Sequence, residues 1–249
     1  MRLLLSFLVQ YSNNHLIEVS CGFEFPEETT TWDSTYFGRY FEKIKSLGFN
    51  QRTERKGVQI KFEANLIDAS KEPFTTSQAE DQVIFRDEEK GLAVLIGKGR
   101  ISFHCVKNYM GWEGFLNEVI KPYSELYKTL DLGNGKRQCS IVYLNRFNKE
   151  VGDGLSDYFT LISPLEQKFG AEIITSVQRI ISNKNNLLIS KLNSQVIQNI
   201  QNINLECGAV CIDEECIKNN DWIYQANQTH EPIFNFFKAI TTDNLRNTL

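Results

Sequence analysis

Residues 91–106 read GLAVLIGKGRISFHCV, which is two short apolar runs on either side of the turn Gly97-Lys98-Gly99. Runs of this length around a glycine turn are typical of a β-hairpin, so we predict strands over 92–96 and 101–105. In the second run His104 lies between Phe103 and Cys105, and alternation along a strand places its side chain on the face opposite theirs. Strands joined by hairpins pair antiparallel, so this stretch predicts an antiparallel sheet.

The residues before the hairpin predict a strand, a helix and two more strands. Residues 15–25 alternate apolar and polar side chains and stop at Pro26, which is typical of a strand. Apolar residues then recur at helical spacing from a cap at Asp33 or Ser34 to Leu47. A period of two returns at 58–62 and 83–85, which gives four strands up to Cys105.

A long amphipathic helix follows, and after it the order of elements repeats. Apolar residues share one face from Trp112 to Leu130, and Pro122 predicts a kink. The second half predicts a strand, a short helix capped by Ser156, a hairpin, a further strand and a final helix that Pro232 opens. Its strands are expected at 139–147, 173–181, 187–192 and 205–212.

This order predicts an α+β fold made of two β-α-β(4)-α-like halves, residues 1–131 and 137–249. Consecutive hairpins cannot build a parallel sheet, so we expect one curved antiparallel sheet with the helices on one face. The halves are expected to merge into one domain, by analogy with the saddle of TATA-binding-like proteins or with helix-grip proteins.

Composition and charge exclude several classes of protein. The 249 residues carry 27 Lys and Arg against 31 Asp and Glu, a net charge of -4, which disfavours a nucleic-acid partner and excludes a polybasic membrane segment. No apolar run reaches the roughly 18 residues of a membrane span. Met1 to Val9 is charged and apolar like the start of a signal peptide but lacks a cleavage site, so we interpret it as a first strand or a docked arm of a cytoplasmic protein.

Six cysteines are too few for a disulfide scaffold of this size, and we interpret them as reduced thiols. They are Cys21, Cys105, Cys139, Cys207, Cys211 and Cys216. The last three lie close together, but their spacers do not match a zinc site and no second pair follows. A strand would place Cys207 and Cys211 on one face as core residues. We therefore predict no metal and no cofactor, and leave a metal at Cys207, Cys211 and Cys216 as the alternative.

The sequence contains no catalytic motif, but four residues are candidates for ligand binding. No serine stands in a G-x-S-x-G elbow, and no glycine loop has phosphate-binding spacing. His104 could line the concave face of the sheet. The strand 143–147 places an amide between two rings on one face, which suits hydrogen bonding to a ligand. The predicted ligand-binding residues are His104, Tyr143, Asn145 and Phe147, each with packing as its alternative role. His230 is expected to cap the last helix.

Several segments together resemble a bacterial family described only as sporadically distributed. They are Ile17 to Phe25, Trp32, Phe37-Gly38, Tyr109 to Phe115, Tyr143 to Phe147 and His230 to Thr241. The resemblance covers most of the chain, although the apolar lead at Met1 to Val9 departs from it. It implies no assigned activity and no catalytic residues, and its patchy occurrence is similar to that of genes carried with defence or toxin-antitoxin loci.

These observations favour a non-enzymatic binding or accessory protein with a protein partner, associated with a mobile defence or toxin-antitoxin locus. The first alternative is a small-molecule or nucleotide sensor that uses the concave sheet face. The second is an enzyme whose Cys or His site is assembled only in the fold. Oligomerisation of the chain is left open.

Overall fold

The fold is known from a computed structural model that describes most of the chain. The described residues are 15–25, 32–55, 58–62, 74–78, 82–132, 135–150, 154–162, 173–182, 185–198, 200–219 and 221–246. The apolar lead from Met1 to Val9 lies outside them, so its predicted role is not addressed.

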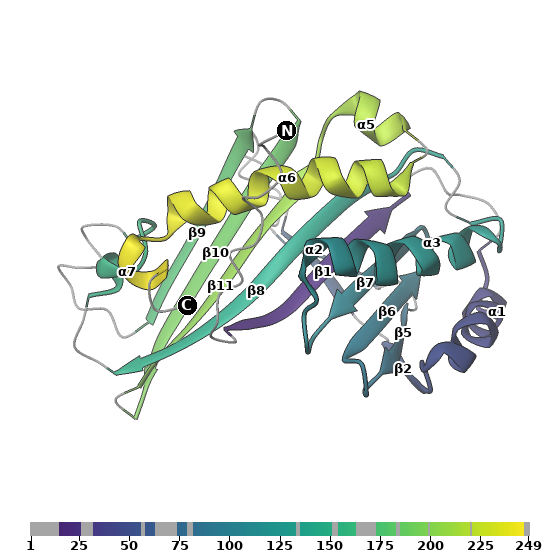
Figure 1. Cartoon of the computed structure of the whole chain (residues 1–249), viewed down its shortest axis with the longest axis horizontal. Helices are drawn as coiled ribbons and strands as arrows, with labels where there is room; N and C mark the ends of the chain where they lie inside the picture. The colour runs from purple at the N-terminus through teal and green to yellow at the C-terminus, as the bar shows by residue number, and fades with distance from the viewer. Residues whose placement is uncertain are drawn as a thin grey trace, which may run out of the picture.

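A nine-stranded antiparallel sheet is the framework of the protein (Figure 1). Its strand order is β2-β5-β6-β7-β1-β8-β11-β10-β9, and β3 pairs with β4 in a separate two-stranded sheet. The strands are β1 (Leu16–Glu24), β2 (Gln51–Arg55), β3 (Val58–Phe62), β4 (Phe74–Gln78), β5 (Gln82–Asp87), β6 (Leu92–Gly97), β7 (Arg100–Cys105), β8 (Gln138–Glu150), β9 (Ile173–Ser182), β10 (Asn186–Ile197) and β11 (Ile200–Cys211).

The two parts of the sheet have the same strand order. In the first part β1 pairs with β7, the last strand before the long helix, and in the second part β8 pairs with β11 in the same way. The sheet is continuous because β1 and β8 also pair with each other. This confirms the predicted α+β class and antiparallel sheet.

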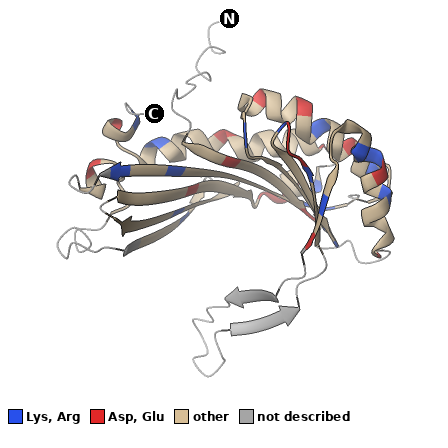
Figure 2. Ribbon diagram, turned by 90° about the horizontal axis from the view of Figure 1, so that it is seen from below, with Lys and Arg blue, Asp and Glu red and all other residues tan. Residues whose placement is uncertain are grey.

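Figures 1 and 2 show the principal helices on one face of the sheet. The longest, α6, packs on β8, β10 and β11. The helical elements are α1 (Thr35–Ile44), η1 (Lys45–Leu47), α2 (Gly111–Gly114), η2 (Phe115–Ile120), α3 (Lys121–Lys128), η3 (Leu155–Asp157), α5 (Glu214–Lys218), α6 (Trp222–Ile240) and α7 (Asp243–Arg246). Among the described residues, no helix is long and apolar enough to cross a membrane.

Alternating residues of the strands form the core beneath these helices. Val19, Cys21 and Phe23 of β1 are fully buried, and so are Leu205 and Cys207 of β11. Alternation points the residues between them to the other face of the sheet, which we call the open face. Its residues are half-buried or exposed over much of β1, β7, β8 and β11.

The helix predicted from Trp112 to Leu130 is present, but it changes type along its length. Its middle part, η2, is a π-helix, and α3 begins with Lys121 and Pro122. Proline has no N–H to donate to a carbonyl one turn earlier, and π turns accommodate such a break without ending a helix. The irregularity expected at Pro122 thus takes the form of a π-helical segment.

Three sequence-based expectations need correction. The last helix begins at Trp222 rather than at Pro232, and Asp221 caps it by accepting hydrogen bonds from the Ile223 and Tyr224 amides at 2.9 and 3.1 Å. His230 is therefore an interior helix residue and not a cap. Within residues 154–162, the part of this segment that the structure describes, the helix expected after Ser156 is the short η3. Strands β2 and β4 lacked a period-two apolar pattern and were missed.

The interior position of Pro232 is compensated by a side chain from the sheet. Proline cannot donate to the carbonyl four residues earlier, which is that of Gln228. Asn186, at the start of β10, donates its Nδ2–H to this carbonyl oxygen at 3.1 Å. This side-chain amide of a buried residue thus supplies the hydrogen bond that the helix lacks at Pro232.

We expect Asn186→Ala to lower the free energy of unfolding by about 1 kcal/mol, because it removes the donor to the part-buried Gln228 carbonyl. In a Pro232→Ala background the restored amide N–H would supply that donor, so the same substitution should cost less. Urea unfolding of the four proteins in this double-mutant cycle measures the difference. Equal costs in both backgrounds would contradict the compensation.

Candidate functional site

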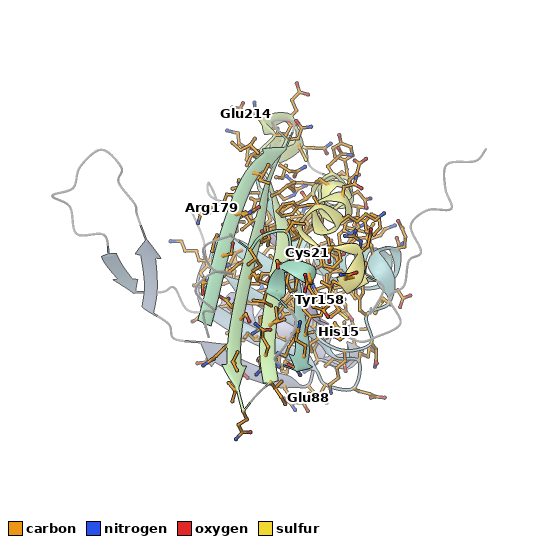
Figure 3. The ribbon with its side chains drawn as sticks, turned by 90° about the vertical axis from the view of Figure 1, so that its left-hand side faces the viewer. His15, Cys21, Glu88, Tyr158, Arg179 and Glu214 are labelled. Carbon is orange, nitrogen blue, oxygen red and sulfur yellow. The ribbon has the colours of Figure 1, made fainter. Side chains whose placement is uncertain are left out.

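One row of residues in register crosses all nine strands on the open face, with His104 near its middle. In strand order the row is Gln51, Arg86, Ala93, His104, Ser20, Val142, Gly208, Ile189 and Arg179. Directly paired residues share a face, so all of these side chains point away from the helices. Arg179 ends the row because β9 is the last strand of the sheet, and Figure 3 labels it on β9, away from α6.

The neighbouring row on the same face is small and rich in hydroxyl groups at its centre. It consists of Thr53, Ile84, Leu95, Ser102, Gly22, Ser140, Val210, Leu187 and Ile181. Neither row contains Phe, Tyr or Trp. The described centre of the open face is thus a polar area of short side chains around one imidazole.

Glu18, His104 and Ser102 form a hydrogen-bonded chain in this area. The Nδ1 atom of His104 lies 2.6 Å from Oε1 of Glu18, and its Nε2 atom lies 2.8 Å from Oγ of Ser102. The His104 and Glu18 side chains remain 22% and 33% exposed. The three groups are therefore joined to one another and accessible from solvent.

The partners of His104 assign its tautomer. An ionised carboxylate only accepts hydrogen bonds, so Nδ1 carries the proton that it donates to Glu18. In the neutral imidazole Nε2 then has a free lone pair and accepts the Ser102 hydroxyl proton. A hydroxyl, an imidazole base and a carboxylate that orients it are the parts of an activated nucleophile.

Gly22 leaves a gap beside Ser102. A Cβ atom at Gly22 would lie 3.1 Å from Oγ of Ser140 and 3.6 Å from Cβ of Ser102. Because glycine has no such atom, no side chain of β1 stands between the two serines at this position. Ser102 lies on one side of Gly22 and Ser140 on the other.

The open face carries an excess of positive charge. Among the strand residues whose side chains the structure describes, five cations and three carboxylates point to this face: Arg86, Arg100, Arg146, Arg179 and Lys191 against Glu18, Glu24 and Glu206. Arg100 pairs with Glu24 at 3.3 Å and Lys191 with Glu206 at 3.7 Å. Arg146 contacts an amide, Asn204 Oδ1, at 3.1 Å.

The other three predicted ligand-binding residues lie on the opposite face from His104. Tyr143, Asn145 and Phe147 pair with residues that point under the helices, such as Cys207 and Leu205. The predicted set therefore does not converge on one site. The amide of Asn145 does lie between the rings of Tyr143 and Phe147 along β8, but on the core side of the sheet. A ligand-binding role for each of these residues stays a prediction.

Tyr143 belongs to an aromatic cluster between the sheet and α6. Its hydroxyl lies 3.0 Å from that of Tyr109, and burial raises the pKa of both phenols. The His230 ring stacks on Trp112 with 4.0 Å between ring centroids and an interplanar angle of 1°. Burial lowers the pKa of His230 to about 4, so this imidazole is neutral at pH 7.

The cysteines are buried thiols in the structure. All six are free, and burial raises the pKa of Cys207 and Cys216 to about 12. Cys211 and Cys216 line a cavity of about 200 Å³ with Asp213 and Glu215. Among the described residues no group of three or more His, Cys, Asp or Glu is arranged to hold a metal ion.

A second cavity, of about 260 Å³, lies between β8, β11 and α7. It is lined by His15, Phe147, Asn148, Lys149, Tyr158, Phe159, Ile203 and Leu245. The Lys149 ammonium lies 4.0 Å from the centroid of the Tyr158 ring, a cation–π contact. Figure 3 shows His15 and Tyr158 near each other. Neither cavity includes a residue of the Glu18, His104 and Ser102 chain.

Comparison of the chain with protein-family models, with curated proteins and with solved structures finds no match.

Proposed function

We propose that the protein is a binding protein whose open sheet face receives an acidic surface of a partner protein. The observation that carries the proposal is the positive excess on this face in a chain whose net charge is -4. Such a local excess attracts carboxylates while the rest of the surface repels them.

The side chains of the face favour a protein over other ligands. Ile181 and Val177 are 66% and 51% exposed beside Arg179, a mixture of apolar and arginine groups that suits a protein interface. Single-stranded nucleic acid needs aromatic rings on which bases stack, and the two central rows offer none. A sensor that encloses its small-molecule ligand needs a concave pocket, and neither described cavity contains residues of these two rows.

Association with a defence or toxin-antitoxin locus remains part of this proposal, as does a cytoplasmic location. The partner is expected to present clustered Asp and Glu next to an apolar patch. A second copy of the chain is the competing occupant, and it is distinguished by the mass of the cross-linked product.

Site-specific photo-cross-linking in the native host tests which face is used. A photoreactive amino acid at Ile181 on the open face is expected to give one cross-linked product with another protein. The matched control is Tyr224 on α6, which is 45% exposed on the helix side. The Ile181 product should be lost when Arg179→Glu and Arg146→Glu are added, since both reverse the charge of the face.

Each result of the cross-linking experiment either supports or contradicts the proposed binding face. A product at Ile181 that depends on the two arginines and is absent at Tyr224 supports the proposal. A product at both positions, no product at Ile181, or a product insensitive to charge reversal contradicts it. A product of twice the chain mass would mean that a second copy of the chain, and not an acidic partner protein, occupies the open face.

A further inference from the structure

We propose that Ser102 is a nucleophile activated by His104 and Glu18, and that it accepts the acyl group of small activated esters. This step goes beyond the proposed binding function and does not depend on it. The juxtaposition of Glu18 Oε1, His104 and Ser102 Oγ within 2.6 and 2.8 Å is the observation on which it rests.

The order of the three groups is the one that nucleophilic catalysis requires. The carboxylate accepts a hydrogen bond from Nδ1–H, so Nε2 is the free base, and Nε2 is the nitrogen that contacts the serine. Glu18 comes from β1 and the other two residues from β7, which pair in register, so the sheet holds the chain in place. Because backbone pairing already holds the three side chains in position, no entropy is lost in ordering them when the reaction occurs.

Gly22 leaves the approach to Ser102 free of a side chain from β1. A carbonyl carbon above Gly22 would be next to Ser102, with the Ser140 hydroxyl on the other side as a donor to the carbonyl oxygen. A bulky acyl group would crowd the Ser140 hydroxyl, which even a Cβ atom at Gly22 would approach to 3.1 Å. The substrate class is therefore an ester with a short acyl chain and a good leaving group.

The chemistry balances with water as the only other reactant. Ser102 Oγ forms a bond to the acyl carbon and gives its proton to His104 Nε2, the bond to the leaving alkoxide breaks, and His104 returns the proton to that alkoxide. Water then attacks the acyl-serine, with His104 accepting one water proton and returning it to Ser102. The products are the alcohol and the carboxylic acid.

A fluorophosphonate probe on the purified chain tests the inference without any partner. Phosphonylation forms the Oγ–P bond and releases fluoride, with the serine proton going first to His104, and intact mass followed by peptide mapping locates the adduct. We expect one adduct, on Ser102. Ser102→Ala should abolish it, and His104→Gln should slow labelling about 100-fold or more.

Further variants separate activation from folding. Glu18→Gln should slow labelling at least about tenfold, because it no longer orients the imidazole as an anion. Gly22→Ala should slow it about tenfold, because the added Cβ would lie 3.1 Å from Ser140 Oγ and 3.6 Å from Ser102 Cβ. The matched controls are His15→Gln, whose imidazole contacts the Arg146 carbonyl, and Ser176→Ala, whose hydroxyl donates to the Leu161 carbonyl. Both should label at the wild-type rate.

Thermal melts of every variant show whether the fold is kept. Labelling of Ser102 that falls in His104→Gln with the melt unchanged supports the inference. No adduct, an adduct on another residue, or Ser102 labelling at an unchanged rate in His104→Gln overturns it and leaves the three residues as a packing network. Because neither the probe nor these variants involve Arg179 or a partner, this result is independent of the cross-linking result.

Discussion

Replacing Trp222 with alanine is expected to lower the free energy of unfolding by about 3–5 kcal/mol, the range for a large buried aromatic residue. Trp222 is the first residue of α6 and is 1% exposed. Its ring lies 4.5 Å from the ring of Phe23 and 5.4 Å from that of Phe25, measured between centroids. The substitution therefore opens a cavity between α6 and the first part of the sheet.

A second cost arises because Trp222 also covers a buried cation. The guanidinium of Arg137 lies 5.1 Å from the Trp222 ring centroid, and its Nη2–H donates to the Asn219 carbonyl at 2.8 Å. Arg137 is 1% exposed, and because burial leaves its charge poorly solvated, the pKa of its guanidinium is lowered to about 10. Removing the ring takes away a favourable cation–π contact from that charge.

Urea unfolding of Trp222→Ala beside Tyr224→Ala measures the effect. Tyr224 lies two residues along the same helix but is 45% exposed, so its loss should cost below about 1 kcal/mol. If the two variants are equally stable, Trp222 does not join α6 to the sheet as the ring contacts indicate.

Local patterns predicted most of the strands because their signals lie within a few residues. The hairpin at Gly97-Lys98-Gly99 was predicted from two apolar runs and a glycine turn, and β6 and β7 have that arrangement. β2 was missed because its sequence, QRTER, is polar on both faces, as an edge strand allows. The start of α6 was misplaced because Pro232 is a helix-start signal, while its compensation by Asn186 comes from a distant strand.

In the candidate site, the pairing between strands decides which residues share a face of the sheet, and alternation within one strand does not. Alternation within β7 placed His104 opposite Phe103, and within β8 it placed Tyr143, Asn145 and Phe147 together. Whether two strands present their candidates on the same face depends on their register with β1, which no local pattern reveals. Ser102 was within reach, since it stands two residues before His104 on one strand. Glu18 was not, because it is 86 residues away in sequence and joins His104 only through the β1–β7 pairing.

Acid is expected to destabilise the protein through His230, by about 3 kcal/mol between pH 6.5 and pH 4. Burial holds the pKa of this imidazole at about 4 in the folded chain, against 6.5 in an exposed one. Its ring is stacked on Trp112, whose Nε1–H donates to Asn227 at 2.8 Å, and the Tyr143 ring lies 6.0 Å away. Both neighbouring rings are uncharged, so they provide no counter-ion for an imidazolium.

The direction follows from which state binds the proton first. Above pH 6.5 His230 is neutral in both states and contributes no pH dependence. As the pH falls below 6.5 the unfolded chain takes up a proton that the folded chain cannot accept, so stability falls. Below about pH 4 the folded chain is protonated as well and the loss stops growing.

Urea unfolding from above pH 6.5 down to about pH 4 measures this loss, and His230→Phe is the matched variant. Phenylalanine keeps a ring that can stack on Trp112 but cannot be protonated. All other titratable groups are the same in both proteins, so the difference between the two curves isolates His230. We expect His230→Phe to lose about 3 kcal/mol less than the wild type across this interval. Parallel curves would mean that the His230 ring is protonated in the folded state, and the stack on Trp112 would then have to open in acid.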